Sequence, residues 1–341
     1  MGGSDGPPRG RGAGVSTLLD QFGRTIEYLR ISVTDRCNFR CRYCMPLEGL
    51  PWLPKADILS YEEIREVVSQ LAPMGLRRIR ITGGEPTIRP QLETLVRFIR
   101  DVPGVEDIAL STNGVKLPQL SHALAAAGLD RVNISADSLR PERIVAIARR
   151  DLGFDPVVAA TAAQTAGLGP IKLNVVVMRG VNDDEVVDFA RLTLDNPWHV
   201  RFIELMPVGA LEPMTEEMVV PSDEVLSRIQ AALGHLTSGG GPERGNGPAA
   251  YYRLPSAAGS VGVITPMTHT YCGSCNRVRL TADGRLRTCL FGDHEVDLRA
   301  PLRAGAPLAP FVRQALAEKP EAHALLTHRV GGLRALSQVG G

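Results

Sequence analysis

Six short runs of β-branched and aliphatic residues alternate with longer segments of helical periodicity between residues 29 and 206. The runs predict strands and read LRISV, RRIRIT, DIALST, RVNIS, IKLNVVVM and VRFIEL; the helical segments include 61–75, 91–101, 117–128 and 155–168. Repeated βα units predict a parallel sheet with crossover helices. Because six units are too few for a closed eightfold barrel, we expect an α/β fold built on a partial (β/α)6 barrel of the TIM type.

Polar residues directly follow several of the predicted strands. TDRCNFRCRYC comes after the first strand, GGEP after the second, TNG after the third and SAD after the fourth, while Met206 and Pro207 follow the sixth. The carboxyl ends of parallel strands meet at one edge of the sheet, where the active sites of such folds form. We therefore expect these segments to converge on one site.

The composition is that of a globular chain without strong overall charge. Its 341 residues include 44% hydrophobic residues and carry a formal net charge of +1, which gives no general attraction to nucleic acid or to an anionic membrane. The chain has no apolar run long enough to span a membrane, and residues 1–16 lack the apolar core of a signal peptide. We therefore expect a disordered tail over residues 1–16 and a cytoplasmic protein, in which clustered thiols are more often metal ligands than disulfides.

The βα rhythm stops after Pro207. A helical stretch at 221–233 leads into the Gly-rich segment 239–248, which has the composition of a flexible connector. Short strand-like pieces follow it, namely YYRL, VGVI and RVRL, together with a second group of cysteines. The sequence therefore predicts a barrel over residues 17–235 and a smaller C-terminal module over residues 250–341.

Three of the six cysteines, Cys37, Cys41 and Cys44, lie within eight residues of each other. A closed structural zinc site needs four ligands, and the first histidine after this motif is His122. On a four-iron, four-sulfur (4Fe-4S) cluster, three thiolates leave one iron without a protein ligand, so a small molecule can bind there. The spacing C-x-x-x-C-x-x-C favours such an open iron-sulfur centre, with zinc as the alternative.

This motif, with the aromatic Tyr43 before its last cysteine, resembles the signature of radical S-adenosylmethionine (SAM) enzymes. The resemblance implies that SAM chelates the open iron through its amino and carboxylate groups, and that reductive cleavage gives a 5′-deoxyadenosyl radical. GGEP resembles the segment that holds the SAM amino group, a role that falls on Gly84. Glycines let the backbone approach a ligand closely, and Glu85 offers an acceptor.

Cys272, Cys275 and Cys289 form a second set of three thiols. By the same reasoning they predict a second 4Fe-4S cluster with its own open iron, suited to direct ligation of a substrate nitrogen. Arg277 and Arg279 alternate on the strand-like run beside them, so both side chains face the same way. Two guanidinium groups next to an open metal site indicate a phosphate-bearing substrate.

From residue 22 to residue 341 the chain resembles a family of radical SAM lyases that cyclise GTP at the start of molybdenum cofactor biosynthesis. The segments that carry this resemblance are FGRTIEYLRISVTDRCNFRCRYCMP, RIRITGGEPTIRP, STNG, IKLNVVVMRGVNDDE, RFIELMPVG, YCGSCNRVRL and the terminal GG. The resemblance implies that SAM is bound by Tyr43, Gly84, Ser135 and Met206. It implies that GTP is bound by Arg30, Arg80, Ser111, Lys172, Arg277, Val278 and Arg279, with Arg201 as a further cation.

The same resemblance implies the reaction and its partners. The radical takes the hydrogen atom from C3′ of the ribose, the C3′ radical adds to C8 of guanine, and an electron and a proton complete the product. The guanine base is expected on the open iron of the second cluster. The tail residues Gly340 and Gly341 are expected to reach into the cavity and assist, because only a backbone without side chains fits a narrow channel. The expected partners are a reductant of unknown identity, a downstream synthase that makes cyclic pyranopterin monophosphate, and a second copy in a homodimer.

Two other functions are compatible with parts of the pattern. A peptide-modifying radical SAM enzyme also carries an auxiliary cluster, but such proteins tend to have more cysteines in the C-terminal module and do not need Arg277 and Arg279. A zinc-stabilised binding protein on a βα scaffold is colourless and redox-inactive, whereas an iron-sulfur protein is brown.

Overall fold

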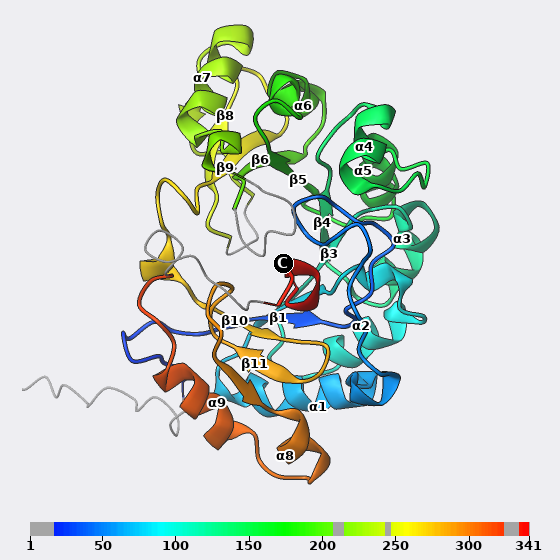
Figure 1. Cartoon of the computed structure of the whole chain (residues 1–341), viewed down its shortest axis with the longest axis vertical. Helices are drawn as coiled ribbons and strands as arrows, with labels where there is room; N and C mark the ends of the chain where they lie inside the picture. Colours follow the sequence, from blue (N-terminus) through cyan, green and yellow to red (C-terminus); the bar gives the residue numbers. More distant parts are fainter. Residues whose placement is uncertain (1–16, 207–214, 243–246, 324–333, 341) are drawn as a thin grey trace, which may run out of the picture.

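One curved sheet runs through the chain (Figure 1). The computed structural model describes residues 17–206, 215–242, 247–323 and 334–340. Over these residues the sheet has 12 strands in the order β12-β11-β10-β1-β2-β3-β4-β5-β6-β9-β8-β7. Its two ends do not pair with each other, so the sheet is an open, partial barrel, as the sequence predicts.

The six predicted strands form the centre of this sheet. They are β1 (Tyr28–Ser32), β2 (Arg78–Thr82), β3 (Asp107–Thr112), β4 (Arg131–Ser135), β5 (Lys172–Val177) and β6 (His199–Glu204). Each strand is parallel to the next one in chain order. The predicted parallel arrangement is therefore confirmed, and every strand begins and ends within one residue of its predicted bounds.

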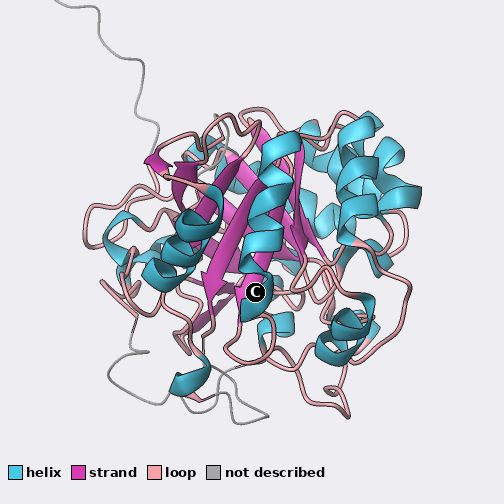
Figure 2. Ribbon diagram, turned by 90° about the horizontal axis from the view of Figure 1, so that it is seen from above, coloured by secondary structure: helices cyan, strands magenta, loops and turns pink. Residues whose placement is uncertain are grey.

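Helices cover the outer face of the sheet (Figure 2). They are α1 (Tyr61–Leu71), α2 (Leu92–Arg100), α3 (Leu117–Ala126), α4 (Pro141–Ala148), α5 (Pro156–Thr165), α6 (Val186–Asp195), α7 (Ser222–Leu233), α8 (Arg299–Arg303) and α9 (Ala309–Ala317). α1 begins with a capping box in which Ser60 and Glu63 bind each other's backbone N–H groups. It ends earlier than predicted because Pro73 has no N–H to continue the helix. Within the described ranges, no helix is long and apolar enough to cross a membrane.

The C-terminal strands extend both edges of the central sheet. They are β7 (Thr237–Ser238), β8 (Ala250–Arg253), β9 (Ser260–Ile264), β10 (Arg277–Leu280), β11 (Arg285–Arg287) and β12 (Glu295–Asp297). β9 pairs with β6 in parallel, while β10 pairs with β1 in parallel at the other end. The strands expected in a smaller module therefore join the barrel sheet, because the free edges of β1 and β6 offer backbone groups to pair with. As a result, Cys275, which lies just before β10, is brought beside the first strand.

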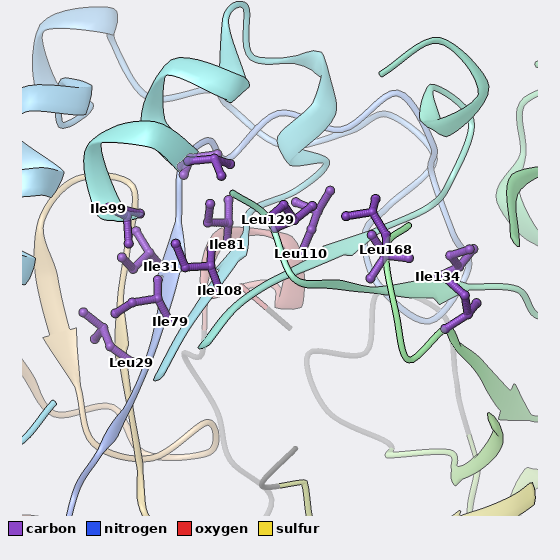
Figure 3. Close-up of a cluster of buried hydrophobic side chains, with 14 of the residues drawn as sticks. Leu29, Ile31, Ile79, Ile81, Ile99, Ile108, Leu110, Leu129, Ile134 and Leu168 are labelled. Carbon is purple, nitrogen blue, oxygen red and sulfur yellow. The ribbon is translucent and has the colours of Figure 1, made fainter. Parts of the chain in front are cut away.

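Side chains alternate along the central strands between an apolar and a polar environment. The outward-facing side chains are apolar and pack against the helices; Figure 3 shows examples, namely Leu29, Ile31, Ile79, Ile81, Ile108, Leu110 and Ile134, together with Ile99 of α2. The inward-facing side chains are largely polar and include Tyr28, Arg30, Arg80, Ser111, Asn133, Ser135, Asn174 and Arg201. Apolar outer faces are expected where helices cover a sheet. The polar inner face makes the interior of this barrel a candidate site instead of a packed core.

Replacing Leu110 with alanine tests the outer core. The Leu110 side chain is fully buried, so we expect Leu110→Ala to lower the free energy of unfolding by about 2–5 kcal/mol, through lost burial and the cavity left behind. Leu152→Ala is the matched control: this leucine is 42% exposed, and we expect a change within about 0.5 kcal/mol. Urea unfolding followed by circular dichroism measures both. Equal losses in the two variants would contradict the assignment of the core.

Candidate active site

A cavity of about 290 Å³ lies at the carboxyl ends of the central strands. Part of its wall comes from β1–β6 and from the loop that follows β1. Another part comes from segments far along the chain, namely Tyr271, Arg277, Arg279, Leu290, Leu336 and Ser337. In Figure 1 the C-terminal end lies near the centre of the curved sheet, close to β1. The convergence predicted from the polar strand ends is therefore observed.

The loop after β1 brings Cys37, Cys41 and Cys44 to the wall of this cavity. All three are free thiols. The backbone fixes the loop: Cys44 N donates to the Cys41 carbonyl oxygen (2.9 Å), and Arg40 N donates to the carbonyl oxygen of Ala148 at the end of α4 (2.8 Å). The three ligands expected from the sequence thus share one site, which main-chain hydrogen bonds hold in place.

The thiols of this first triplet are poor acids in the protein alone. Burial raises the pKa of Cys37 to about 12 and the pKa of Cys44 to about 11, and it raises the pKa of Cys41 well above its ordinary value. The neighbouring thiols and carboxylates add to the shifts at Cys37 and Cys41. Metal ligands must be deprotonated, so three thiolates here need a bound cation. The donor set fits a 4Fe-4S cluster, whose irons would supply that positive charge.

Ligand placement also bears on the zinc alternative. Among the residues that the structure describes, no three Cys, His, Asp or Glu side chains are positioned to share one metal ion.

The second triplet lies close to the same cavity, although none of its three cysteines is itself part of the cavity wall. Cys272 and Cys275 precede β10, and Cys289 follows β11; all three are free thiols. The cavity wall includes their sequence neighbours Tyr271, Arg277 and Leu290. Burial acts to raise the pKa of Cys275, but the nearby cations Lys319 and Arg277 outweigh it, so the pKa of this thiol is lowered. Positive charge thus outweighs burial at Cys275, whereas the effect of Arg40 on Cys37 in the first triplet does not outweigh burial there.

Gly84 of the GGEP segment packs directly on the cysteine loop. Its N–H donates to the Thr34 carbonyl oxygen (2.7 Å), which ties the end of β2 to the residues before Cys37. A Cβ atom on Gly84 would stand 2.2 Å from the Arg36 carbonyl oxygen. No side chain fits at this position, so the close backbone approach inferred for the GGEP glycines is present here.

Glu85 has a different role from the one expected. Its buried carboxylate accepts hydrogen bonds from Thr87 N (3.0 Å), Thr112 Oγ1 (2.7 Å) and Asn113 N (2.7 Å). The sequence suggested an acceptor for a ligand, whereas the structure shows a carboxylate occupied by the protein. Glu85 joins the ends of β2 and β3 and is itself part of the cavity wall.

The four residues that the resemblance assigns to SAM all line the cavity, namely Tyr43, Gly84, Ser135 and Met206. The Tyr43 hydroxyl donates to Asp137 Oδ2 (2.7 Å), and Asp137 Oδ1 accepts from Val176 N (2.9 Å). Burial raises the pKa of Asp137 to about 6. Asp137 was not predicted as a site residue. Its position two residues after the inward-facing Ser135 was the available signal, because alternation turns both side chains to the cavity.

Three arginines stand side by side on one wall. Arg279 of β10 is in register with Arg30 of β1, and Arg30 is in register with Arg80 of β2. Burial, together with repulsion from nearby cations, lowers the pKa of Arg80 and Arg279 to about 10 each, and it lowers the pKa of Arg30 well below its ordinary value. Crowded, buried positive charge is unfavourable without a counter-charge. This arginine wall is therefore suited to a polyanion.

Two polar side chains that were not predicted position the arginines. Asn174 Oδ1 accepts from Arg201 Nε (2.8 Å) and Nη2 (2.6 Å), and the Tyr28 hydroxyl accepts from Arg80 Nε. Both side chains occupy inward-facing strand positions, which was the signal that could have found them. Three more residues that were predicted to bind GTP also line the cavity, namely Ser111, Arg201 and Arg277.

Two residues that were predicted to bind GTP, Lys172 and Val278, do not line the cavity. Lys172 is buried at the start of β5, in register with His199 of β6. Burial lowers its pKa to about 6, and repulsion from Arg201, Arg131 and Arg80 adds to the shift. Val278 lies on the opposite face of β10, in the hydrophobic core, so any contact with a ligand would come through its backbone.

The C-terminal tail reaches the arginine wall. The Gly340 carbonyl oxygen accepts from Arg279 Nη1 (2.5 Å). Gly340 has a φ of +69°, and a Cβ atom there would lie 2.6 Å from Thr82 Cγ2 at the end of β2. Gly340 therefore contacts the arginine wall but does not itself line the cavity, and Gly341 lies outside the described residues.

Two family models match the chain in succession. The model of the Radical SAM superfamily matches residues 31–193, and that of Molybdenum Cofactor Synthesis C matches residues 198–325. The crystal structure of Streptococcus suis SuiB bound to precursor peptide SuiA has a TM-score of 0.58, at 12% identity over 88% of this chain and 72% of that chain, which supports the fold. Together with the cysteine loop at the barrel mouth, these matches define the class: the protein is a radical SAM enzyme.

Curated relatives are similar over nearly the whole chain. GTP 3′,8-cyclase of Pelotomaculum thermopropionicum is 50% identical over 330 residues, which cover 95% of this chain and 100% of that protein. The enzymes of the same name from Heliobacterium modesticaldum and Moorella thermoacetica are each 48% identical, with the same coverage. The chain belongs to the GTP 3′,8-cyclase family.

Adding a methyl group at Gly84 tests the contact between GGEP and the cysteine loop. Because a Cβ would collide with the Arg36 carbonyl, we expect Gly84→Ala to displace the loop and abolish SAM binding, with loss of iron from the first triplet. Gly273→Ala is the matched control, since Gly273 also lies in a cysteine loop but a Cβ there meets nothing within 4 Å. Iron analysis and equilibrium binding of SAM measure the effect. Normal SAM binding by Gly84→Ala would contradict the steric argument.

Proposed function

We propose that this protein catalyses the radical SAM-dependent cyclisation of GTP to (8S)-3′,8-cyclo-7,8-dihydroguanosine 5′-triphosphate, the first step of molybdenum cofactor biosynthesis. The observation that carries the proposal is the arginine wall, in which Arg279, Arg30 and Arg80 stand in register and line the same cavity as the first cysteine triplet. A triphosphate offers the negative charge that these guanidinium groups need. Membership of the GTP 3′,8-cyclase family supports the same activity.

The first triplet would hold a 4Fe-4S cluster that leaves one iron open for SAM. When bound, this pair supplies a 5′-deoxyadenosyl radical for hydrogen abstraction. The chain's own residues would bind and orient: Tyr43, Gly84, Ser135 and Met206 border the SAM side of the cavity, and the arginine wall holds the nucleotide. Holding C3′ of the ribose close to the abstracting carbon, away from water, is the protein's main contribution. Hydrogen-atom abstraction needs no general base, so no carboxylate is assigned that role.

The second triplet, Cys272, Cys275 and Cys289, would hold a second 4Fe-4S cluster. Cys275 lies two residues before Arg277 and Cys289 directly precedes Leu290, and both Arg277 and Leu290 line the cavity. A cluster held here would offer an open iron to the guanine base of a bound nucleotide. Gly340, and Gly341 after it, would contact the substrate from the tail, since the Gly340 carbonyl already reaches Arg279.

The proposed reaction also requires partners. One electron is consumed in SAM cleavage and another in completing the product, so a reductant must supply both. A synthase that converts the cyclised nucleotide to cyclic pyranopterin monophosphate would act next. We place the protein in the cytoplasm as a homodimer.

Formation of 5′-deoxyadenosine by the reduced, anaerobically reconstituted protein tests the proposed function. SAM is supplied with and without GTP, and the nucleotide products are analysed in the same reactions. GTP-stimulated cleavage together with a cyclised nucleotide is the expected result. Cleavage that ignores GTP would point to another substrate, such as a peptide, and a protein that holds iron and sulfide but does not cleave SAM would contradict the role of the first triplet.

Removing single arginines tests the triphosphate site. A hydrogen bond to a charged group contributes about 1.5–3 kcal/mol. We therefore expect Arg277→Ala and Arg279→Ala each to raise the dissociation constant of GTP about 10- to 100-fold, with both clusters retained. Arg285→Ala is the control, since Arg285 pairs with Asp297 (3.2 Å) and lies outside the cavity wall. Equilibrium dialysis gives the affinities, and unchanged values for both wall variants would remove the case for a triphosphate here.

Lys172 predicts a pH dependence of GTP binding, although it does not line the cavity itself. Its pKa is lowered in part by Arg80 and Arg201, which do line the cavity, so a polyanion bound to these arginines would relieve that repulsion. With a pKa of about 6, this lysine is mainly neutral in the free protein at pH values above that, and charged below it. A bound polyanion favours the charged form, so GTP binding should take up a proton and should tighten as the pH falls from about 8 to about 6. Calorimetry in buffers of different ionisation enthalpy measures the uptake. Lys172→Met is the control, because any proton uptake that it still shows comes from GTP or from other groups. If the variant and the wild type take up the same number of protons on binding GTP, the prediction is contradicted.

A further inference from the structure

A buried lysine lies against the second cysteine triplet. Lys319 follows α9 and is 2% exposed. Its Nζ atom lies 3.6 Å from Cys275 Sγ, and it donates to the carbonyl oxygens of Arg277 (3.1 Å) and Thr288. Arg277 begins β10, and Thr288 directly precedes Cys289. One ammonium group therefore links the two segments that carry the triplet.

The segment that carries Lys319 is held by residues near the N-terminus. Gln21 Nε2 donates to the Lys319 carbonyl oxygen (3.0 Å). Arg24, which is paired with Asp20 Oδ2 (2.5 Å), donates to three carbonyl oxygens, those of Cys272 (2.8 Å), Pro320 (2.7 Å) and Glu321 (2.8 Å). In Figure 1 the blue segment before β1 and the red segment after α9 lie on the same side of the molecule. Lys319 is thus fixed by a clamp that also holds the backbone of Cys272.

Among the residues that the structure describes, the hydrogen-bond partners of Lys319 carry no full negative charge. Taking an ammonium group out of water is unfavourable unless an anion compensates. The hydrogen-bond partners named above are two carbonyl dipoles and a thiol. If Cys275 ligates a cluster it becomes a thiolate, and the contact becomes a charge-assisted hydrogen bond.

We propose that Lys319 is a positioning residue for the second 4Fe-4S cluster, which it stabilises in the reduced state by donating to the Cys275 thiolate. The inference rests on the second cluster of the proposed function. Reduction adds one electron to the cluster, drawn from the reductant that the reaction already requires, and no bond is made or broken. Net charge and hydrogen bonds to the sulfur ligands set the potentials of such clusters, so a nearby cation raises the potential.

Lys319 acts from outside the cavity. It lies outside the wall that Arg277 and Arg279 help to form, so its ammonium group does not face the nucleotide. Loss of its charge should therefore change the cluster and leave GTP affinity unchanged. This separates Lys319 from the arginines, whose removal should weaken GTP binding directly.

A redox titration of the reconstituted full-length protein, followed by electron paramagnetic resonance, tests the inference. Lys319→Met keeps the length of the side chain without its charge, and Lys319→Arg keeps the charge. Lys116→Met, at an exposed lysine before α3, is the control. We expect Lys319→Met to lower the reduction potential of the second cluster by about 59 mV or more. For a one-electron couple, a shift of about 59 mV makes the ratio of reduced to oxidised cluster ten times smaller at a given potential. Lys319→Arg and Lys116→Met should stay close to the wild type, with the same GTP affinity in all four proteins.

Iron and sulfide analysis decides the other outcomes. A second cluster that is intact in Lys319→Met and has the wild-type potential overturns the inference. If Lys319→Met loses the second cluster, retention of the cluster by Lys319→Arg supports the need for charge, and equal loss by both variants overturns it. A wild type that takes up iron for only one cluster contradicts the second cluster of the proposed function, and Lys319 has no role without that cluster.

Discussion

Repulsion among buried cations inside the barrel is the constraint on which the site depends. Parallel pairing places Arg279, Arg30 and Arg80 in register, and the apolar outer faces of the same strands keep these side chains turned inward. Two arginines of the wall have neutral hydrogen-bond partners: the Tyr28 hydroxyl accepts from Arg80, and the Gly340 carbonyl oxygen accepts from Arg279. Partners of this kind orient guanidinium groups but do not neutralise them. The cavity therefore carries buried positive charge that a polyanionic ligand would compensate.

The two cysteine sites show the opposite electrostatic problem. At the first triplet, burial raises the pKa of all three thiols, and neighbouring thiols raise the pKa of Cys37 and Cys41 further. A bound cation would stabilise the thiolate forms. The second triplet has Lys319 and Arg277 next to Cys275. Under the proposed function, the thiols would bind iron and the arginines would bind the phosphates of the substrate, so each kind of site would receive the charge that it needs.

Much of the site could be predicted because the chemistry of its residues is local. Three cysteines in one loop indicate a metal centre and glycines after a strand indicate a close backbone approach, and strand alternation correctly turned Arg277 and Arg279 to one face. Roles that depend on contacts between distant segments could not be predicted. Glu85 looked like a free acceptor until the partners from β3 were known, and Lys319 lies 44 residues from Cys275 in sequence, with no pattern to link them.

The sequence by itself determined the six central strands, their parallel order and the two sets of thiols, because hydrophobic periodicity and ligand spacing act over short distances along the chain. Only the tertiary structure decided that β9 and β10 pair with opposite edges of the barrel sheet, at β6 and β1. Pairing across more than 200 residues depends on which backbone edges remain free after the barrel forms, and no local pattern encodes that. The same pairing puts Arg279 beside Arg30 and the second triplet beside the cavity, so it is the fold that turns separate motifs into one site.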